Sequence, residues 1–508
     1  MPSFEELADL ANLVQPNKIK NLVLVGTTSN PDSKLDEFYH AIVHNNVAND
    51  DEAAALLYQT TPQLPAYYKL KERLYESLLT TSFFIDVNQP FFLDHQRAYH
   101  LCLRQLLAVK ALLVRGARQA AIPLAKKGFK KAQKFEFTDI ALAFAKHLRT
   151  HYGTIVGDKK NYNKYNNLVS HYLGLYSSEL KAEEFYTELI INYVNSSETK
   201  QEVLGISEKY AKELKNLLKR HESYQLYFLS YLVFILRYQV ANDYKNIIKV
   251  SNEAIQYFET KKHLVSKAAI FHYAFKMTSA YIQLKNYPKA EEMAKKCLDH
   301  VDEGISNWYT ALDYNILVSF HSKKFQQAYY TYQKAVNHSS FSQQYKYISE
   351  RWKTLEAFIY YLIIKGLVKP DEKSQLKKFR IKKFLNEVPN YSKDKRGNNI
   401  TILILHVLFL LQQQKYDEII DRVESLKTYT HRYLRQDDTF RSNCFIKMLL
   451  QLPAASFHKK GVIRKAKKYW DKLLSVPLEK SNQNADIEII PYETLWAFVL
   501  DSLDNRFH

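Results

Sequence analysis

Glycine and proline are scarce in this chain of 508 residues, which contains 11 glycines and 13 prolines. An average protein contains about 7% glycine, roughly three times the fraction found here. Because both residues interrupt regular structure, their scarcity favours long, uninterrupted elements. It also excludes the glycine-rich loops that hold phosphate groups in many nucleotide-binding enzymes.

Cysteine is rarer still, with three residues, Cys102, Cys297 and Cys444, far apart in the sequence. An odd number at these spacings forms neither a disulfide framework nor a zinc motif. Free thiols fit a reducing compartment, so we expect the protein to be cytoplasmic. The first residues are acidic and lack the basic and apolar regions of a signal peptide, which agrees with that expectation.

Long apolar runs are also missing. The two most apolar stretches are residues 224–238, which include Arg237, and residues 400–411. Both fall short of the roughly 18–20 apolar residues that span a bilayer. We therefore expect buried core helices at these places and no membrane span.

Positive charge is abundant: 72 Lys and Arg stand against 53 Asp and Glu, a net charge of +19. Such an excess favours anionic partners, including nucleic acid and acidic proteins, although a lysine-rich solvated surface would also produce it. Two segments, residues 371–396 and 457–472, concentrate the basic residues. They hold the candidate anion-binding residues Lys377, Lys378, Arg380, Lys382, Lys383, Arg464, Lys465, Lys467 and Lys468.

Apolar periodicity and breaker residues predict helices over about 33–46, 50–60 and 63–82, and from near Phe91 to about Val114. The segment 115–129 is a further candidate repeat unit, with Ala121 and Gly128 seven residues apart and Pro123 expected in the first turn of its helix.

A local pattern then repeats along the chain. A short polar turn is followed by an aromatic residue and, three positions later, by a small or apolar residue, with another such residue seven positions beyond. Steps of three and seven keep these side chains on one helix face. The repeats begin 38 to 43 residues apart where they are consecutive, which predicts stacked pairs of helices. The packing residues predicted in this way are Tyr244, Tyr281, Tyr287, Ala290, Phe325, Ala328, Ala335 and Tyr416.

This pattern resembles the tetratricopeptide repeat. In the best unit Tyr281 matches the aromatic late in the first helix, Tyr287 the aromatic that opens the second helix, and Ala290 a small site in that helix. The repeats here are longer than the family standard and lack its closing proline. The resemblance implies an α-solenoid, a right-handed superhelix of antiparallel helix pairs that presents a surface to a protein or peptide.

The predicted fold is thus all-α, with TPR-like repeats between helical N- and C-terminal caps. We expect an N-terminal cap or docking region at 1–90, repeats at 91–370, a basic helix and loop at 371–399, and a further repeat with capping helices at 400–508.

Catalytic motifs are missing from the sequence. No GxSxG nucleophile elbow occurs. The pairs His40–His44 and His147–His151 have metal-compatible spacing, but neither carries a Glu after its first histidine, and we expect surface histidines. We predict no enzyme activity, catalytic residue, metal or cofactor.

The chain contains 38 tyrosines, a large number that favours either repeat packing or a surface that binds a peptide. The function predicted is that of an interaction scaffold, adaptor or regulatory sensor that binds a protein or peptide. The alternative is a nucleic-acid-associated protein that contacts phosphates through the basic segments near the C-terminal end.

Overall fold

The computed structural model describes residues 34–44, 46–83, 86–88, 93–195, 200–261, 264, 266–344, 346–371, 380–381, 398–433, 440–481 and 488–504. Within these ranges the chain forms helices and no strand, which confirms the all-α prediction. No helix among them is both long enough and apolar enough to cross a membrane. The chain divides into two compact units, with the boundary between Ser177 and Ser178.

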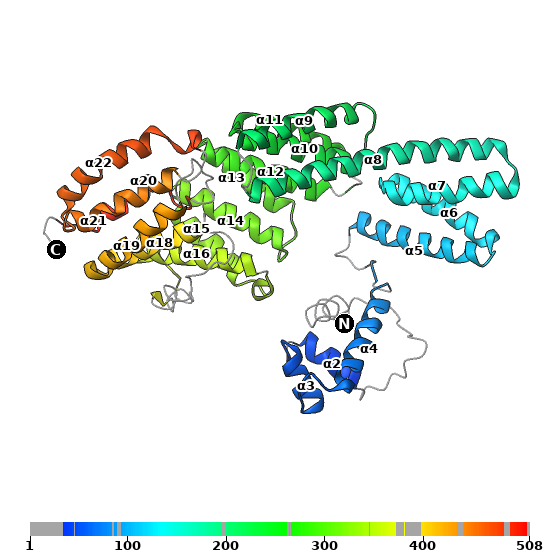
Figure 1. The fold of residues 1–508 in the computed structure, drawn as a ribbon, viewed down its shortest axis with the longest axis horizontal. Coiled ribbons are helices and arrows are strands. Elements are labelled where there is room, and N and C mark those ends of the chain that lie inside the picture. Colours follow the sequence, from blue (N-terminus) through cyan, green and yellow to red (C-terminus); the bar gives the residue numbers. More distant parts are fainter. Residues whose placement is uncertain are drawn as a thin grey trace. The chain divides into compact units, whose positions relative to one another are not determined.

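Unit 1 holds the helices from α2 to the first half of α8 (Figure 1). A π-helical segment, His151–Val156, follows α7, and α8 continues across the boundary. The helix bounds are α2 (Lys34–Val43), α3 (Asp50–Tyr58), α4 (Pro65–Ser82), α5 (Asp94–Val114), α6 (Arg118–Lys134), α7 (Thr138–Thr150) and α8 (Lys159–Asn195).

Helices α2 to α4 share a small core of their own, with Phe38 and Tyr67 fully buried at its centre. The core also contains a buried lysine, Lys71, whose Nζ lies 2.8 Å from Oδ1 of Asp50. Tyr67 donates its hydroxyl hydrogen to the same carboxylate at 2.6 Å. A buried charge needs such a partner, so Asp50 is what allows Lys71 to remain inside.

Helix α6 packs through residues with little or no side chain. Ala121, Ala125, Gly128 and Ala132 are buried and recur at helical spacing, so they lie on one face. That face allows α5 and α7 to come close to α6, and at Gly128 the ring of Phe144 on α7 fills the space that a Cβ atom would need. Ordinary side chains on this face would separate the helices.

In unit 2 successive helices pack on one another as in an α-solenoid, which confirms the predicted class of fold. The unit also includes the second half of α8, the one-turn helix α21 (Gln451–Ala454) and short 3₁₀ turns. Its helices are α9 (Lys200–Leu218), α10 (Tyr224–Val240), α11 (Tyr244–Thr260), α12 (Ser266–Gln283), α13 (Tyr287–Asp299), α14 (Ser306–His321), α15 (Phe325–Val336), α16 (Lys346–Ile364), α18 (Asn398–Gln412), α19 (Tyr416–Tyr433), α20 (Phe440–Leu449), α22 (Lys459–Ser475) and α23 (Tyr492–Asp501).

The short polar turns that precede the aromatic residues of the repeat pattern all have the same backbone hydrogen bond. The amide of Asp243 bonds to the carbonyl of Tyr238 at 2.9 Å, and that of Asn286 bonds to the carbonyl of Tyr281 at the same distance. This six-to-one bond is the Schellman motif, which ends a helix with one residue in the left-handed conformation. Glycine usually fills that position, but here the residues are Asn242 (φ 54°), Lys285 (55°), Lys323 (60°) and Gln414 (55°).

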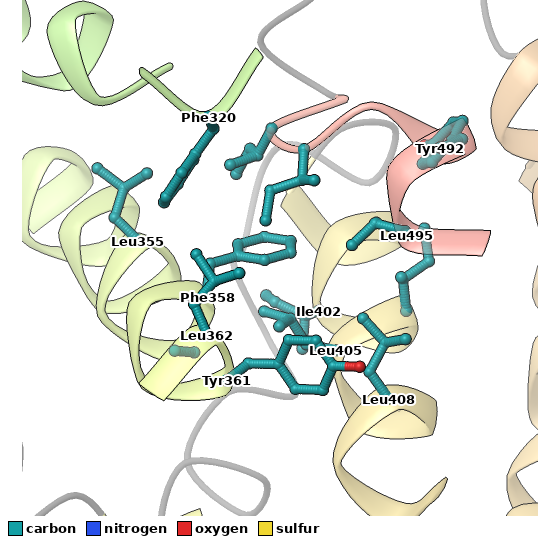
Figure 2. Close-up of a cluster of buried hydrophobic side chains, with 14 of the residues drawn as sticks. Phe320, Leu355, Phe358, Tyr361, Leu362, Ile402, Leu405, Leu408, Tyr492 and Leu495 are labelled. Atoms are coloured by element: carbon teal, nitrogen blue, oxygen red, sulfur yellow. The ribbon is translucent and has the colours of Figure 1, made fainter. Parts of the chain in front are cut away.

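The largest core of unit 2 joins helices far apart in the sequence. Figure 2 shows Phe320 from α14, Phe358 and Tyr361 from α16, Leu405 from α18 and Leu495 from α23 gathered in one cluster. The C-terminal segment therefore does not simply extend the row of helices beyond α22. It returns and covers the apolar faces of helices from the middle of the unit.

We predict that Gly128→Ala destabilises unit 1. A Cβ atom at Gly128 would lie 2.4 Å from Cζ of Phe144, whose side chain is fully buried and has little room to move. Overpacking of this kind costs about 1–3 kcal/mol, more than the gain in helix propensity from Gly to Ala. Urea unfolding followed by circular dichroism measures the change.

Gly205→Ala is the matched control, because Gly205 lies in α9 and a Cβ atom added there would meet nothing within 4 Å. There the same substitution stabilises the helix by about 0.5–1 kcal/mol. Equal effects of the two substitutions would show that α6 does not pack closely against α7.

Candidate anion-binding groove

A groove of about 650 Å³ lies in unit 1 along α5 and α6. Lys and Arg account for six of its thirteen lining residues. Helix α5 contributes Asp94, Arg97, Ala98, His100, Leu101 and Arg104, helix α6 contributes Lys127, Lys130, Lys131 and Lys134, and Val87, Asn88 and Phe135 complete the lining.

Helix periodicity explains why the cations share the groove. Lys127, Lys130, Lys131 and Lys134 are spaced so that they fall on one side of α6, opposite the buried alanines and Gly128. Arg97, His100 and Arg104 repeat the same spacing on α5. With a rise of about 1.5 Å per residue, each row extends roughly 10 Å along its helix.

The helices that form the groove carry a large excess of positive charge. Residues 94–135 contain ten Lys and Arg and one acid, Asp94, so their net charge is 10 − 1 = +9. That is nearly half of the +19 of the whole chain. The groove is therefore a region of positive potential, which attracts anions from solution.

Most of the groove cations lack an internal counter-ion. Arg97 is the exception that has a counter-ion. Its Nη1 lies 3.2 Å from Oδ1 of Asp94, and its Nε donates to the carbonyl of Val87 at 3.0 Å. For the others, no carboxylate of a described residue lies within ion-pair distance. These unpaired cations are Arg104, Lys127, Lys130, Lys131 and Lys134.

The phenyl ring that lines the groove, Phe135, is half-buried and packs against neighbouring rings. Phe135 stacks on Phe137 with ring centroids 6.0 Å apart, and the edge of His95 contacts it at the same distance. Its ring therefore contributes to the wall of the groove and offers little surface for stacking. Recognition at this site must come mainly from charge and hydrogen bonding.

The basic residues predicted near the C-terminal end lie elsewhere. Arg464, Lys465, Lys467 and Lys468 are exposed on α22, opposite its buried face. The ammonium group of Lys465 donates to the carbonyl of Ala454, and that of Lys468 lies 4.7 Å from the ring centroid of Tyr469. Arg380 is exposed as well. The four remaining candidates, Lys377, Lys378, Lys382 and Lys383, lie outside the described residues.

The predicted packing residues lie at the contacts between helices. Ala290, Ala328 and Ala335 are completely buried. The aromatic residues are half-buried, and three of them meet rings from other helices or turns. The ring centroids of Tyr287 and Phe325 lie 6.2 Å from those of His321 and Phe498, and the centroid of Tyr416 lies 4.4 Å from that of Phe457. Tyr244, Tyr281 and Phe325 are also half-buried.

Burial disfavours the charged forms of the thiols and of one of the two histidine pairs. All three cysteines are buried, and burial raises the pKa of Cys102 to about 11 and that of Cys297 to about 12. Burial also lowers the pKa of His147 and His151. Among the residues that the structure describes, no three His, Cys, Asp or Glu side chains are placed to hold a metal ion.

No protein-family model, curated protein or solved structure matches this chain.

A second concentration of ionisable groups is buried in unit 2. Arg441 is 0% exposed and holds the carboxylate of Glu488 with two bonds, of 2.8 and 2.9 Å, while Glu493 accepts a third at 3.0 Å. Its remaining N–H groups donate to the carbonyls of Leu473 and Val476 at the end of α22. With every donor occupied, Arg441 has none left for a substrate, and the cluster fastens the C-terminal segment to the helices.

His321 also connects the C-terminal segment to the helices of unit 2. Its Nε2 lies 2.9 Å from the carbonyl oxygen of Glu488, and because a carbonyl only accepts, Nε2 must carry the proton. The ring is buried, and burial lowers its pKa from 6.5 to about 4, with Arg441 and Lys285 adding to the effect and Glu493 opposing it. His321 is therefore neutral in the folded protein at neutral pH.

We predict that His321 makes stability depend on pH. Because the folded pKa lies below the unfolded value, the neutral ring stabilises the fold fully above pH 6.5, and that contribution is lost as the pH falls towards 4. A shift of this size corresponds to about 3 kcal/mol. Urea unfolding at pH values across this window measures it, and His321→Gln removes this part of the pH dependence.

His171→Gln is the control, since His171 is exposed on α8. This variant keeps the pH dependence of the parent protein. If His321→Gln and His171→Gln have the same profile as the parent, His321 is not buried as a neutral ring.

Proposed function

We propose that this protein is a non-enzymatic, TPR-like helical-repeat scaffold or adaptor, and that the groove between α5 and α6 holds an acidic segment of a partner protein. The observation that carries this proposal is the set of unpaired groove cations, Arg104, Lys127, Lys130, Lys131 and Lys134. A cationic groove on a rigid helix pair suits the recognition of acidic or phosphorylated peptide motifs. The recurring helix pairs with small residues at their contacts support the repeat assignment.

The dimensions of the groove favour a polypeptide. Two cation rows of roughly 10 Å match about three residues of an extended chain, at about 3.3 Å per residue. A duplex has a major groove about 12 Å wide and phosphates on both of its sides, so it needs a broader cationic surface. Single-stranded nucleic acid is usually held by aromatic stacking as well as charge, and Phe135 is already packed against Phe137.

The alternative function, binding of nucleic acid, is supported by α22. Its exposed face carries Arg464, Lys465, Lys467 and Lys468 without a neighbouring groove wall, which suits contact with a phosphate backbone. The two proposals assign binding to different helices, so one pair of variants distinguishes them.

We predict that the wild-type protein binds a fluorescein-labelled deca-glutamate peptide and that Lys127→Glu, Lys130→Glu and Lys134→Glu together weaken this binding at least about tenfold. Each exposed charge pair contributes up to about 1 kcal/mol, and reversal of three charges turns attraction into repulsion. Fluorescence anisotropy across a salt series measures the affinity, which falls as salt rises.

The matched control reverses three charges on α22, with Arg464→Glu, Lys467→Glu and Lys468→Glu, and its affinity for deca-glutamate stays within about twofold of the wild type. Titration with labelled oligouridylate tests the alternative. Tight binding of oligouridylate that only the α22 variant loses would overturn the acidic-peptide proposal, as would equal binding of deca-glutamate by the wild type and the α6 variant. Circular dichroism of both variants checks that they are folded.

A further inference from the structure

Helix α10 carries a row of aromatic side chains along one face. Tyr227, Tyr231, Phe234 and Tyr238 follow one another at steps of four, three and four residues, which keeps them aligned on a helix. The row is roughly 17 Å long at 1.5 Å per residue. The three tyrosines are half-buried, and Phe234 is 9% exposed, so the row is a partly open surface and not a sealed core.

A groove of about 480 Å³ runs along the second half of this row. Its walls come from α9, α10 and α11, all within unit 2. Leu218 and Val250 join the aromatic rings as its apolar surface. The basic side chains of the lining are Lys215, Lys219, Arg237 and Lys249, and Glu253 is its acid.

The cations border the rings and remain accessible. Lys215 and Arg237 lie 5.9 and 5.2 Å from the ring centroids of Phe234 and Tyr238. Arg237 also forms an ion pair of 3.1 Å with Glu208, whose side chain is 54% exposed. Lys219 and Lys249 are exposed, and no carboxylate of a described residue lies within ion-pair distance of either.

The faces of the aromatic rings are largely occupied. Tyr227, which does not line the groove, stacks on Tyr257 of α11 with centroids 4.0 Å apart. Tyr231, which does line it, contacts the rings of Tyr227 and Phe234 at centroid distances of 6.1 and 5.7 Å. Phe234 is almost buried, and the guanidinium group of Arg237 covers Tyr238. What the row offers to a ligand is therefore ring edges and tyrosine hydroxyls. Nucleobases need free ring faces for stacking, so this groove suits them poorly.

The chemistry of the groove indicates which side chains its ligand carries. The groove offers ring edges, an apolar surface and accessible cations. Ring edges carry partial positive charge and pack favourably against the faces of other aromatic rings, and ammonium groups attract carboxylates. The part of the row that lines the groove, from Tyr231 to Tyr238, is roughly 10 Å long and corresponds to about three residues of extended chain. We propose that the groove of α9, α10 and α11 binds an extended polypeptide segment in which aromatic and acidic side chains stand close together.

This second site does not depend on the α5–α6 groove. It extends the proposed scaffold function, and it stands even if the first groove binds nothing. The test therefore uses the full-length chain with Lys127→Glu, Lys130→Glu and Lys134→Glu as its parent protein, so that the first groove contributes no attraction.

The probes are two fluorescein-labelled decapeptides of equal charge, one alternating Glu and Tyr and the other alternating Glu and Ser. We expect the Glu–Tyr peptide to bind at least about tenfold more tightly, since each aromatic contact strengthens binding roughly two- to tenfold. Lys219→Glu with Lys249→Glu weakens the binding of both peptides. Tyr238→Ser removes the preference for the Glu–Tyr peptide and leaves the weaker binding of the Glu–Ser peptide.

Tyr330→Ser is the matched control, because Tyr330 is 55% exposed on α15 and lies outside this groove. It retains the preference for the Glu–Tyr peptide. Equal affinity of the two peptides would overturn the proposal, as would loss of the preference in Tyr330→Ser. Displacement of the Glu–Tyr peptide by oligoadenylate at lower concentration than by unlabelled peptide would also overturn it, in favour of a nucleic-acid site.

Discussion

The close contact of successive helices through very small side chains is the constraint on which this structure depends. On α6 the contact face consists of alanines and Gly128, and on α13 and α15 Ala290 and Ala328 are completely buried in the same way. Burying one face of each helix leaves the opposite face to solvent, and the long basic side chains collect there. The groove between α5 and α6 is a direct consequence, since α5 and α6 each direct their cationic side into the same space.

The same constraint explains how a chain with so little glycine forms so many tight helix turns. Residues such as Asn242 and Lys285 take the left-handed conformation that ends a helix, although a Cβ atom makes it less favourable. The Schellman hydrogen bonds and the burial of the flanking helices hold them there. Glycine content alone is thus a poor guide to the number of turns, because tertiary packing can stabilise the left-handed residue.

Much of the fold follows from local sequence signals. The helix predicted from near Phe91 to about Val114 lies at Asp94–Val114 in the structure, and the first three predicted helices match α2, α3 and α4 to within a few residues. The prediction for Pro123 is wrong, because this residue lies in the interior of α6, which begins at Arg118. Burial of Ala121 and Ile122 extends the helix toward its N-terminus, and the exposed Gln119 can leave its unpaired carbonyl to water.

The candidate site could be predicted only in part. The five lysines of α6 and its lack of acidic residues are visible in the sequence, but the alignment with Arg97 and Arg104 of α5 arises from packing. The return of the C-terminal segment, fastened by Arg441, likewise joins residues too far apart for any local pattern to reveal. Long-range contacts of this kind depend on the whole fold and leave no periodic trace in the sequence.

The central claim is that an acidic polypeptide occupies the cationic groove of α5 and α6. Lysine acetylation with mass spectrometry, in the presence and absence of deca-glutamate, tests it most directly on the unmodified wild-type chain. We expect the peptide to slow acetylation of Lys127, Lys130 and Lys134, with Lys467 and Lys468 on α22 reacting as before. Protection of the α22 lysines alone, or equal protection of both sets, would contradict it.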